Sequence, residues 1–316
     1  MLKFIIKRLL SAIPVLFIVV TLVFLLMRVI PGDPATMMLG EDADPADIEA
    51  FKEMMGLNAP IAKQYIDYLK NILTGNWGNS LYYKTPVFQN ILDRMEPTIL
   101  ITLYSTVLSV IIGIPFGVIA ARRRATVTDY SITTLAIFGN SMPSFWLGIM
   151  MVYLFGVQLG WFPVQGYVSI AEGGLLKSLY SITMPSISIG IQNVSSIARY
   201  TRSTMLDVLN EDYVRTARAK GLSEKKVYYK HSLKNSLAPV VTLVGFSIAG
   251  MLGGSVVSET VFNIPGMGKL AYDSLMRRDY PQEQAIILFI AIILVITNII
   301  LDIVYKYLDP RIELDQ

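Results

Sequence analysis

Long apolar runs separated by short polar and basic stretches make up most of this chain. A helix needs about 20 largely apolar residues to cross a membrane, and six stretches reach that length. They are Leu9–Ile30, Thr98–Ala121, Ile132–Val157, Ser181–Ala198, Leu237–Val257 and Ala285–Tyr305. The fourth is the weakest, because Pro185, Gly190, Gln192 and Asn193 interrupt it. The pattern predicts an all-α, polytopic membrane protein with six transmembrane helices.

The first apolar run has to be distinguished from a cleaved signal peptide. Its start, "MLKFIIKRLL", has the positive flank of such a peptide. The run that follows is longer than the roughly 7–15 apolar residues of a signal-peptide core. No small-x-small cleavage site follows it. We therefore expect an uncleaved first transmembrane helix.

The positions of the basic residues predict the orientation. Six spans place both termini on one side, and short loops rich in Lys and Arg favour the cytoplasm. Lys3, Lys7 and Arg8 precede the first span, and Arg122–Arg124 follow the second. Both termini are therefore expected to be cytoplasmic. Residues 1–97 then form a transmembrane helix with an extracytoplasmic helical segment, and residues 98–316 form a five-helix core with a cytoplasmic loop at 199–236.

The extracytoplasmic segment, residues 31–97, is acidic and is predicted to be mostly helical. "PADIEAFKEMMGL" has acidic residues near its start and Gly56 as a stop signal. "APIAKQYIDYLKNILTG" has one apolar face at helical spacing, formed by Ile61, Tyr65, Tyr68, Leu69 and Ile72. Such a face either packs on the membrane part or receives an external partner. Packing is the first expectation.

Composition excludes several classes of function. Only 16% of the 316 residues are charged and 53% are hydrophobic, whereas soluble domains average about 25% charged residues. The absence of cysteine excludes disulfides, thiolate metal sites and a cysteine nucleophile. A single histidine, His231, excludes a multi-histidine metal site. The net charge of +3 is too small to indicate a nucleic-acid partner.

One motif resembles a nucleotide-binding loop without satisfying it. "NIPGMGKL" has Asn263 where the phosphate loop needs its first glycine, and Leu270 where it needs a hydroxyl. The predicted topology also places it outside the cell, away from ATP. A turn that enters a short helix is the favoured interpretation. We predict no catalytic residue and no cofactor or metal site in this chain, which is not expected to be an enzyme itself.

Polar residues inside the third and fourth spans suggest a translocation path. Intramembrane polar groups are costly and usually face a cavity or a neighbouring helix. The candidate path residues are Asn140, Ser141, Ser144, Gln192 and Asn193. The alternative is that these residues form hydrogen bonds between helices, with the glycines of "GFSIAGMLGG" as close-packing points.

The most basic part of the chain, "EDYVRTARAKGLSEKKVYYKHSLKN", lies between the fourth and fifth spans. Asp212 favours a helix start, and Gly221 suits a left-handed helix stop. Ser223 is expected to cap a second helix that continues into the fifth span. Tyr213, Val214 and Ala217 form a small apolar face, and Arg215 and Arg218 share another.

Three interpretations of this segment compete on chemistry alone. It follows the positive-inside rule and contacts anionic lipid, or it is a calmodulin-like target, or it docks a cytoplasmic partner. The ordered helix–Gly–helix arrangement fits a calmodulin target poorly. Small residues next to Gly221 favour the docking interpretation, because another surface can approach them closely.

The same segment resembles a known family. "DYVRTARAKGLSEKKVYYKHSLKNSLAPVV" is similar to the cytoplasmic loop of permease subunits of bacterial ABC importers, and most similar to the dipeptide/oligopeptide branch, first of the two permease subunits. Gly221 and Ala217 match the general loop pattern, whereas Arg215 replaces its glutamate and Thr216 its first alanine. "IPGDPA", "FGNSMPSFWLGI", "LGWFPVQGY" and "SETVFNIPGMGKL" resemble the same branch in the same order.

The resemblance implies the type I ABC importer permease fold in the bacterial cytoplasmic membrane. It implies a second, similar permease subunit as heterodimer partner, two cytoplasmic subunits that bind ATP and Mg²⁺, and an extracytoplasmic substrate-binding protein. It also implies that a coupling helix seats in a groove of an ATPase subunit. The residues carried over are Tyr213, Val214, Arg215, Thr216, Ala217, Arg218, Ala219, Lys220, Gly221 and Leu222.

The expected function is therefore ATP-driven import of di- or oligopeptides. Nickel complexes or glutathione are alternative substrates for the same machinery, because this pattern is shared among such permeases. A self-sufficient secondary carrier is an alternative of another class. The lack of charged residues at mid-membrane and the docking loop oppose it. A non-transporting scaffold is the third hypothesis.

Overall fold

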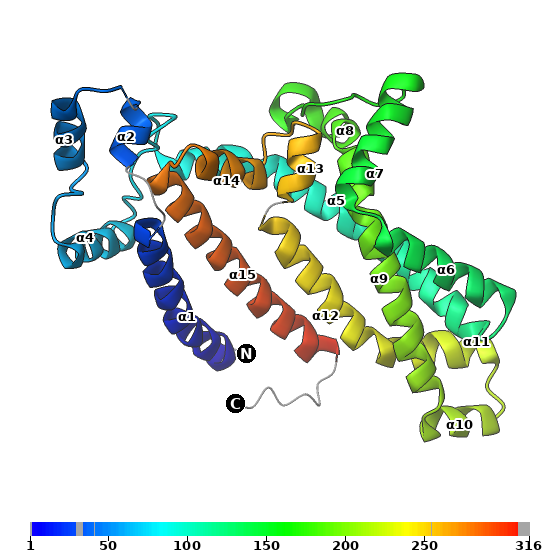
Figure 1. Ribbon diagram of the computed structural model, residues 1–316. Coiled ribbons are helices and arrows are strands. Elements are labelled where there is room, and N and C mark those ends of the chain that lie inside the picture. Colours follow the sequence, from blue (N-terminus) through cyan, green and yellow to red (C-terminus); the bar gives the residue numbers. More distant parts are fainter. Residues whose placement is uncertain (1, 30–33, 41, 254, 309–316) are drawn as a thin grey trace. The chain divides into compact units, whose positions relative to one another are not determined.

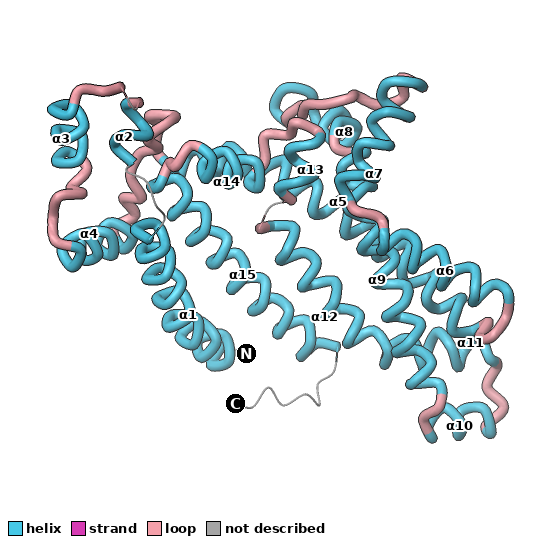
Figure 2. The backbone as a smooth tube through the Cα atoms, viewed as in Figure 1, coloured by secondary structure: helices cyan, strands magenta, loops and turns pink. Residues whose placement is uncertain are grey.

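The computed structural model describes residues 2–29, 34–40, 42–253 and 255–308. This part is almost entirely helical and contains no β-strand, only an isolated bridge between Asn79 and Pro86. Figures 1 and 2 show helices joined by short loops. The helices are α1 (Leu2–Val29), α2 (Pro34–Leu39), α3 (Pro45–Met54), α4 (Ile61–Leu73), α5 (Val87–Arg122), α6 (Val127–Ser141), α7 (Ser144–Met151), the π-helix η1 (Val152–Gln158), α8 (Ile170–Ser181), α9 (Thr183–Leu209), α10 (Asp212–Ala219), α11 (Glu224–Lys226), the π-helix η2 (Val227–Ser232), α12 (Leu233–Leu252), α13 (Val256–Val261), α14 (Met267–Met276) and α15 (Tyr280–Leu308).

The chain forms two compact units, which are described separately. The first unit comprises Met1–Glu96 and Gly266–Val295, and the second comprises Pro97–Pro265 and Ile296–Gln316. The long helices α5 and α15 each continue from one unit into the other.

The first unit has a core where α5, α14 and α15 meet. The buried residues of this core are Val87, Ile91, Met267, Leu270, Ala285 and Ile286. Asp279, just before α15, is buried and holds the loop that precedes α5. Its carboxylate accepts hydrogen bonds from the Ser80 hydroxyl, the Leu81 amide at 3.0 Å and the Tyr82 amide at 3.2 Å.

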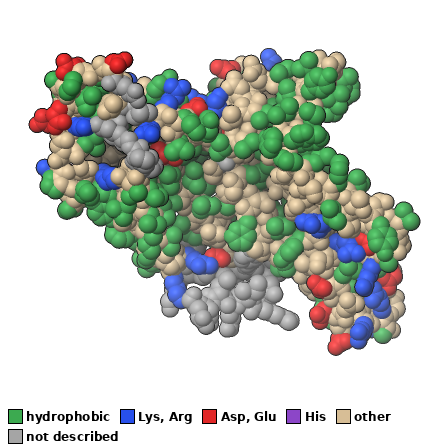
Figure 3. Space-filling view, viewed as in Figure 1, with side chains coloured by type: hydrophobic (Ala, Val, Ile, Leu, Met, Phe, Trp, Pro, Cys, Tyr) green, Lys and Arg blue, Asp and Glu red, His purple; other side chains and the backbone are tan. Residues whose placement is uncertain are grey.

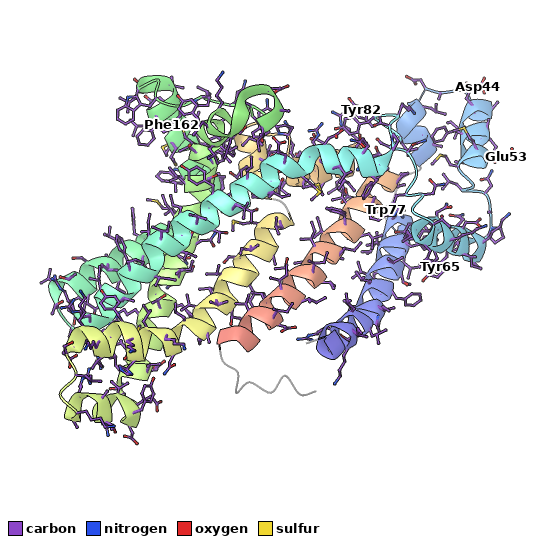
Figure 4. The ribbon with its side chains drawn as sticks, turned by 180° about the vertical axis from the view of Figure 1, so that it is seen from behind. Asp44, Glu53, Tyr65, Trp77, Tyr82 and Phe162 are labelled. Carbon is purple, nitrogen blue, oxygen red and sulfur yellow. The ribbon has the colours of Figure 1, made fainter. Side chains whose placement is uncertain are left out.

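The amphipathic helix α4 packs on α1. Packing on the membrane part was the first expectation for the apolar face of this helix. The Phe24 ring lies 5.0 Å from that of Tyr65 and 5.5 Å from that of Tyr68, between ring centroids. The Thr21 and Tyr65 hydroxyls are 2.6 Å apart. Figure 4 shows Tyr65 on α4 where that helix lies beside α1. Ile61, expected on the packed face, is exposed instead.

The second unit is organised around α9, which contacts α6, α7, α8, α12 and α13. Its largest buried cluster comprises Ile101, Met151, Ile182, Met184, Ile189, Met251, Phe262 and Ile264. A smaller cluster of Val118, Ala121 and Met205 joins α5 to α9 further along. α9 is therefore surrounded by protein over much of its length.

Four helical stretches of the described residues are long and apolar enough to cross a membrane. They are Ile6–Val29, Val87–Arg122, Glu224–Leu252 and Tyr280–Val304. These correspond to the first, second, fifth and sixth predicted spans. The fifth ends at Leu252, earlier than the predicted Val257. The predicted end, Val257, belongs to the separate helix α13, which begins at Val256.

The third predicted span, Ile132–Val157, is wrong as a continuous helix. It is broken into α6 and a second arm, Ser144–Gln158, formed by α7 and η1; the two arms are bent by 94° and count as one span at most. The break lies at Met142, which is extended (φ −77°, ψ 126°), because the ring of the following Pro143 disfavours helical geometry there.

The fourth predicted span, Ser181–Ala198, lies in α9 from Thr183 onward, and α9 is not among the four apolar stretches. Its polar residues contact neighbouring segments, which is where polar groups of a membrane protein are tolerated. The total of six spans and the cytoplasmic termini remain predictions.

The motif "NIPGMGKL" forms a turn that enters a short helix, as predicted. Asn263 has a positive φ of 51°, and α14 begins at Met267.

Candidate functional site

The basic segment folds as the predicted helix and glycine stop. Asp212 lies in the first turn of α10 and Arg218 in the last, which matches the helix dipole at both ends. Gly221 has a φ of 74°, and its amide donates to the Arg218 carbonyl at 2.9 Å. The Leu222 amide donates to the Ala217 carbonyl at 3.3 Å. A left-handed residue directly after a helix is most readily a glycine.

The inner face of α10 is fixed by apolar packing. Val214 and Ala217 are buried together with Val227, and Val208, Leu209 and Leu222 pack around them. These residues come from the end of α9, from α10, from the turn that follows it and from η2. The Tyr213 hydroxyl accepts a hydrogen bond from Asn235 Nδ2 at 2.8 Å, which joins α10 to the start of α12. α10 is therefore attached to both long helices that flank it (Figure 1).

One detail of the local prediction is wrong. Ser223 occupies the residue before α11, but its side chain makes no capping hydrogen bond. The small residue Ala217 faces inward, so Thr216, Ala219 and Gly221 form the accessible small surface. Nothing lies within 4 Å of a Cβ atom built at Gly221, so its backbone conformation, not crowding, requires glycine.

The outer face of α10 carries two arginines with partners inside the chain. Arg215 lies 3.3 Å from Asp212, and Arg218 lies 3.0 Å from Glu224. All four side chains are well exposed, so each pair contributes little to stability. Figure 3 shows Lys and Arg gathered over the end of the second unit that holds α10 and α11.

An ion pair that the sequence analysis did not identify joins α6 to α9 upstream of α10. Arg202 Nε and Nη2 donate to the two carboxylate oxygens of Asp129 at 2.6 and 2.8 Å. Asp129 is buried and also accepts from the Ala125 amide at 3.0 Å. The available signal in the sequence was a carboxylate, Asp129, at the edge of the third apolar run, and an arginine, Arg202, just after the fourth.

Three candidate path residues make contacts between segments. Gln192 Nε2 donates to the Met142 carbonyl at 2.7 Å, at the break between α6 and α7. Asn140 Oδ1 accepts from the Ser196 hydroxyl at 3.1 Å, and Asn193 Nδ2 lies 3.6 Å from Met251 Sδ. Contacts of this kind are what the alternative interpretation, hydrogen bonding between helices, predicts. α9 brings Gln192, Asn193 and Ser196 together with α6, α7 and α12.

The other two candidates lie at the same break. The Ser141 hydroxyl donates to the Ile137 carbonyl of its own helix at 2.8 Å. Ser144 is half-buried at the start of α7. Of "GFSIAGMLGG", Gly245 is a close-packing point, because a Cβ atom there would overlap Leu301, whereas Gly250 faces open space.

Comparison with known families decides the class. The model of the binding-protein-dependent transport system inner membrane component matches residues 113–314, and that of the N-terminal part of such membrane components matches residues 1–102. The chain belongs to this family. The resemblance to importer permeases is thereby confirmed, as is a multi-pass location in the inner membrane. Members of this family are membrane components of a transport system and are not themselves catalytic.

Curated relatives match this permease over nearly its whole length. The oligopeptide transport system permease protein AppB of Bacillus subtilis (strain 168) is 42% identical over 315 residues, which is 99% of this chain and 100% of that protein. The probable peptide ABC transporter permease protein y4tP of Sinorhizobium fredii is 40% identical over 310 residues, 98% of this chain and 99% of that one. The glutathione transport system permease protein GsiC of Escherichia coli (strain K12) is 42% identical over 313 residues, 99% of each.

A solved structure shares the fold of this permease. An inward-facing form of the MetNI methionine ABC transporter matches with a TM-score of 0.56 at 15% identity, covering 71% of this chain and 98% of that one. The expected all-α importer-permease fold is confirmed at this level.

Proposed function

We propose that this permease is a membrane-spanning subunit of an ATP-driven importer of di- and oligopeptides. Family membership supports the importer class, and the peptide-transporting relatives AppB and y4tP support the substrate class. GsiC is equally similar, and glutathione is itself a tripeptide. Uptake of labelled peptides by the reconstituted complex, with glutathione and nickel complexes as competitors, separates these substrates. Uptake that continues without ATP but stops when the proton gradient is collapsed would instead favour the secondary carrier.

The proposed partners follow from that class. They are a second, similar permease subunit, two cytoplasmic ATPase subunits that hold ATP and Mg²⁺, and an extracytoplasmic substrate-binding protein. The proposed arrangement has residues 1–97 as an N-terminal helix with an extracytoplasmic segment and residues 98–316 as the permease core. Asn140, Ser141, Ser144, Gln192 and Asn193 are proposed to line the path.

The observation that supports the coupling role is the packing of α10 on its neighbouring helices. Val214 and Ala217 seat it on the end of α9 and on η2, while Thr216, Ala219 and Gly221 remain accessible. A short exposed helix that is attached to two long helices can transmit a push on its outer face to both. We propose that residues 213–222 are the surface that an ATPase subunit contacts.

The test places a bulky side chain on that surface without disturbing the fold. Ala219→Trp adds an indole at an exposed position in the last turn of α10. It should leave membrane insertion unchanged and abolish ATPase association or coupled uptake. Gly221→Trp should do the same but adds backbone strain, because Gly221 has a positive φ.

The matched control is Val127→Trp, at an uncharged position that is 80% exposed at the start of α6, outside the segment. It should retain association and uptake. Normal ATPase binding and uptake by the Ala219→Trp protein would refute the docking proposal while leaving the transport class intact.

A further inference from the structure

A cavity that plays no part in the proposed coupling or path lies within the first unit. Its volume is about 700 Å³ and it is partly open. Residues of α1, α3, α4 and α15 and of the loop before α5 line it. Two basic side chains, Arg28 and Lys52, and one acidic side chain, Asp67, belong to this lining in the described part of the chain. Met27, Ile72 and Leu288 are among its apolar residues.

Arg28 faces the cavity with donors to spare. Its Nε and Nη2 donate to Gln64 Oε1 at 3.2 and 2.8 Å, and its Nη1 donates to the Phe24 carbonyl at 3.0 Å. These bonds use three of the five N–H groups of a guanidinium. One donor remains on each terminal nitrogen, so the guanidinium retains N–H groups for charge-assisted hydrogen bonds to an oxyanion. No carboxylate among the described residues pairs with Arg28.

An aromatic ring also covers one face of the Arg28 guanidinium. Its Cζ lies 3.4 Å from the centroid of the Phe24 ring, a cation–π contact that fixes its plane. The nearby Tyr68 hydroxyl is buried and has no hydrogen-bond partner among the described residues. Burial raises the pKa of Tyr68 to about 12, against an opposing effect of Arg28, so this hydroxyl keeps its proton at neutral pH.

The depth of Arg28 indicates what kind of oxyanion reaches it. It is the penultimate residue of the apolar stretch Ile6–Val29, where a transmembrane helix meets the headgroup region. α4 reaches the same level, since its Gln64 accepts hydrogen bonds from Arg28 and its Tyr65 contacts Phe24 one turn earlier. The apolar side chains of α4 that do not pack on α1 are open, with Leu73 86% and Ile66 63% exposed. An amphipathic helix with such a face lies in a membrane interface.

We propose that this cavity binds the phosphate of a phospholipid in the leaflet that the carboxyl end of α1 reaches. Arg28 grips the phosphate with its two remaining donors, and Lys52 lies in the same lining. The acyl chains extend over the exposed apolar surface of α1, where Leu25 and Leu26 face outward. A lipid held there joins α1 to α3 and α4, two helices that have no fully buried residue of their own.

The test measures lipid binding to the full-length chain in mild detergent. Native mass spectrometry follows the titration with phosphatidylglycerol, and wild type should retain one lipid per chain. Arg28→Gln should raise the apparent Kd for the lipid about tenfold, the size expected for loss of charge-assisted hydrogen bonds. Lys63→Gln removes an equal charge from α4 outside the cavity and should match wild type.

A second variant addresses the cavity without touching the guanidinium. Asn71→Trp fills the lining from the exposed side of α4. It should lose the bound lipid while the melting temperature of the lipid-free chain stays that of wild type. It decides the outcome if Arg28→Gln fails to fold. Equal weakening by Arg28→Gln and Lys63→Gln, or full binding by Asn71→Trp, would overturn the proposal. Displacement of the lipid by millimolar inorganic phosphate or by a tripeptide would overturn it in favour of a free-anion site or a peptide site.

Discussion

At the residue scale, the ion pair of Asp129 with Arg202 is the most consequential contact that the sequence did not reveal. Asp129 is 3% exposed and Arg202 is 29% exposed, measured on their side chains. Both carboxylate oxygens are occupied by the guanidinium, and backbone Ala125 adds a further donor. Removal of one partner leaves the other charged and largely out of water, which is strongly destabilising.

Asp129→Asn should therefore lower the free energy of unfolding by about 3 kcal/mol. Thermal unfolding of the detergent-solubilised chain measures the loss. The double variant Asp129→Asn with Arg202→Met should recover part of it, since no unpaired guanidinium remains. Unchanged melting of the single variant would show that the pair adds no stability.

Gly245 and Gly250 form a matched pair on one helix, α12. A Cβ atom at Gly245 would overlap the Leu301 side chain, whereas one at Gly250 meets nothing within 4 Å. Gly245→Ala should destabilise the protein by about 1–3 kcal/mol through overpacking. Gly250→Ala should be neutral or stabilise by up to about 1 kcal/mol, because alanine favours the helix. Equal melting temperatures for both variants would contradict this close packing.

At the element scale, local signals were predictable and long-range geometry was not. Asp212 and Gly221 set the ends of α10 through their own backbone chemistry, which the sequence displays directly. Met142 before Pro143 signals a break, but nothing local specifies that α6 and α7 turn by 94°. Ser223 illustrates the opposite error, because a residue of the right type at the right position makes no cap.

The break between α6 and α7 provides a test of the two interpretations of the polar residues. Gln192→Leu removes the bond to the Met142 carbonyl and should lower stability by about 1 kcal/mol, since a partly buried acceptor loses its donor. Asn193→Leu removes only the weak 3.6 Å contact with sulfur and should cost less.

Uptake assays on the same two proteins complete that comparison. Lost transport with unchanged melting in both variants supports a polar path. Lost transport that follows melting temperature supports interhelical hydrogen bonds alone. Wild-type uptake in both would remove these residues from the path.

At the scale of the whole molecule, the absence of cysteine allows the topology to be tested directly. Leu73→Cys lies on the exposed face of α4 and Ala219→Cys on α10. Between them the chain passes α5, the bent pair α6–α7, and α9. Three crossings place the two positions on opposite sides. A membrane-impermeant maleimide should then label Leu73→Cys in intact cells and Ala219→Cys only after permeabilisation.

That experiment also tests the bent pair. If α6 and α7 enter and leave the membrane on one face, the number of crossings becomes even and both cysteines react from the same side. The sequence could not decide this, because a hydropathy pattern is equally consistent with a straight helix and a re-entrant one. It did predict the four apolar stretches, since their composition alone satisfies the length of a span.

α9 has a mechanical consequence as a single uninterrupted helix. Its 27 residues make a stiff rod of about 40 Å, at 1.5 Å per residue. Asp129 holds it at Arg202, which can serve as a fulcrum. The arm from Arg202 to the α10 end is then about 10 Å, and the arm to Gln192 is about 15 Å. A lever with these arms would turn each ångström of displacement at α10 into about 1.5 Å of opposite displacement beside Gln192.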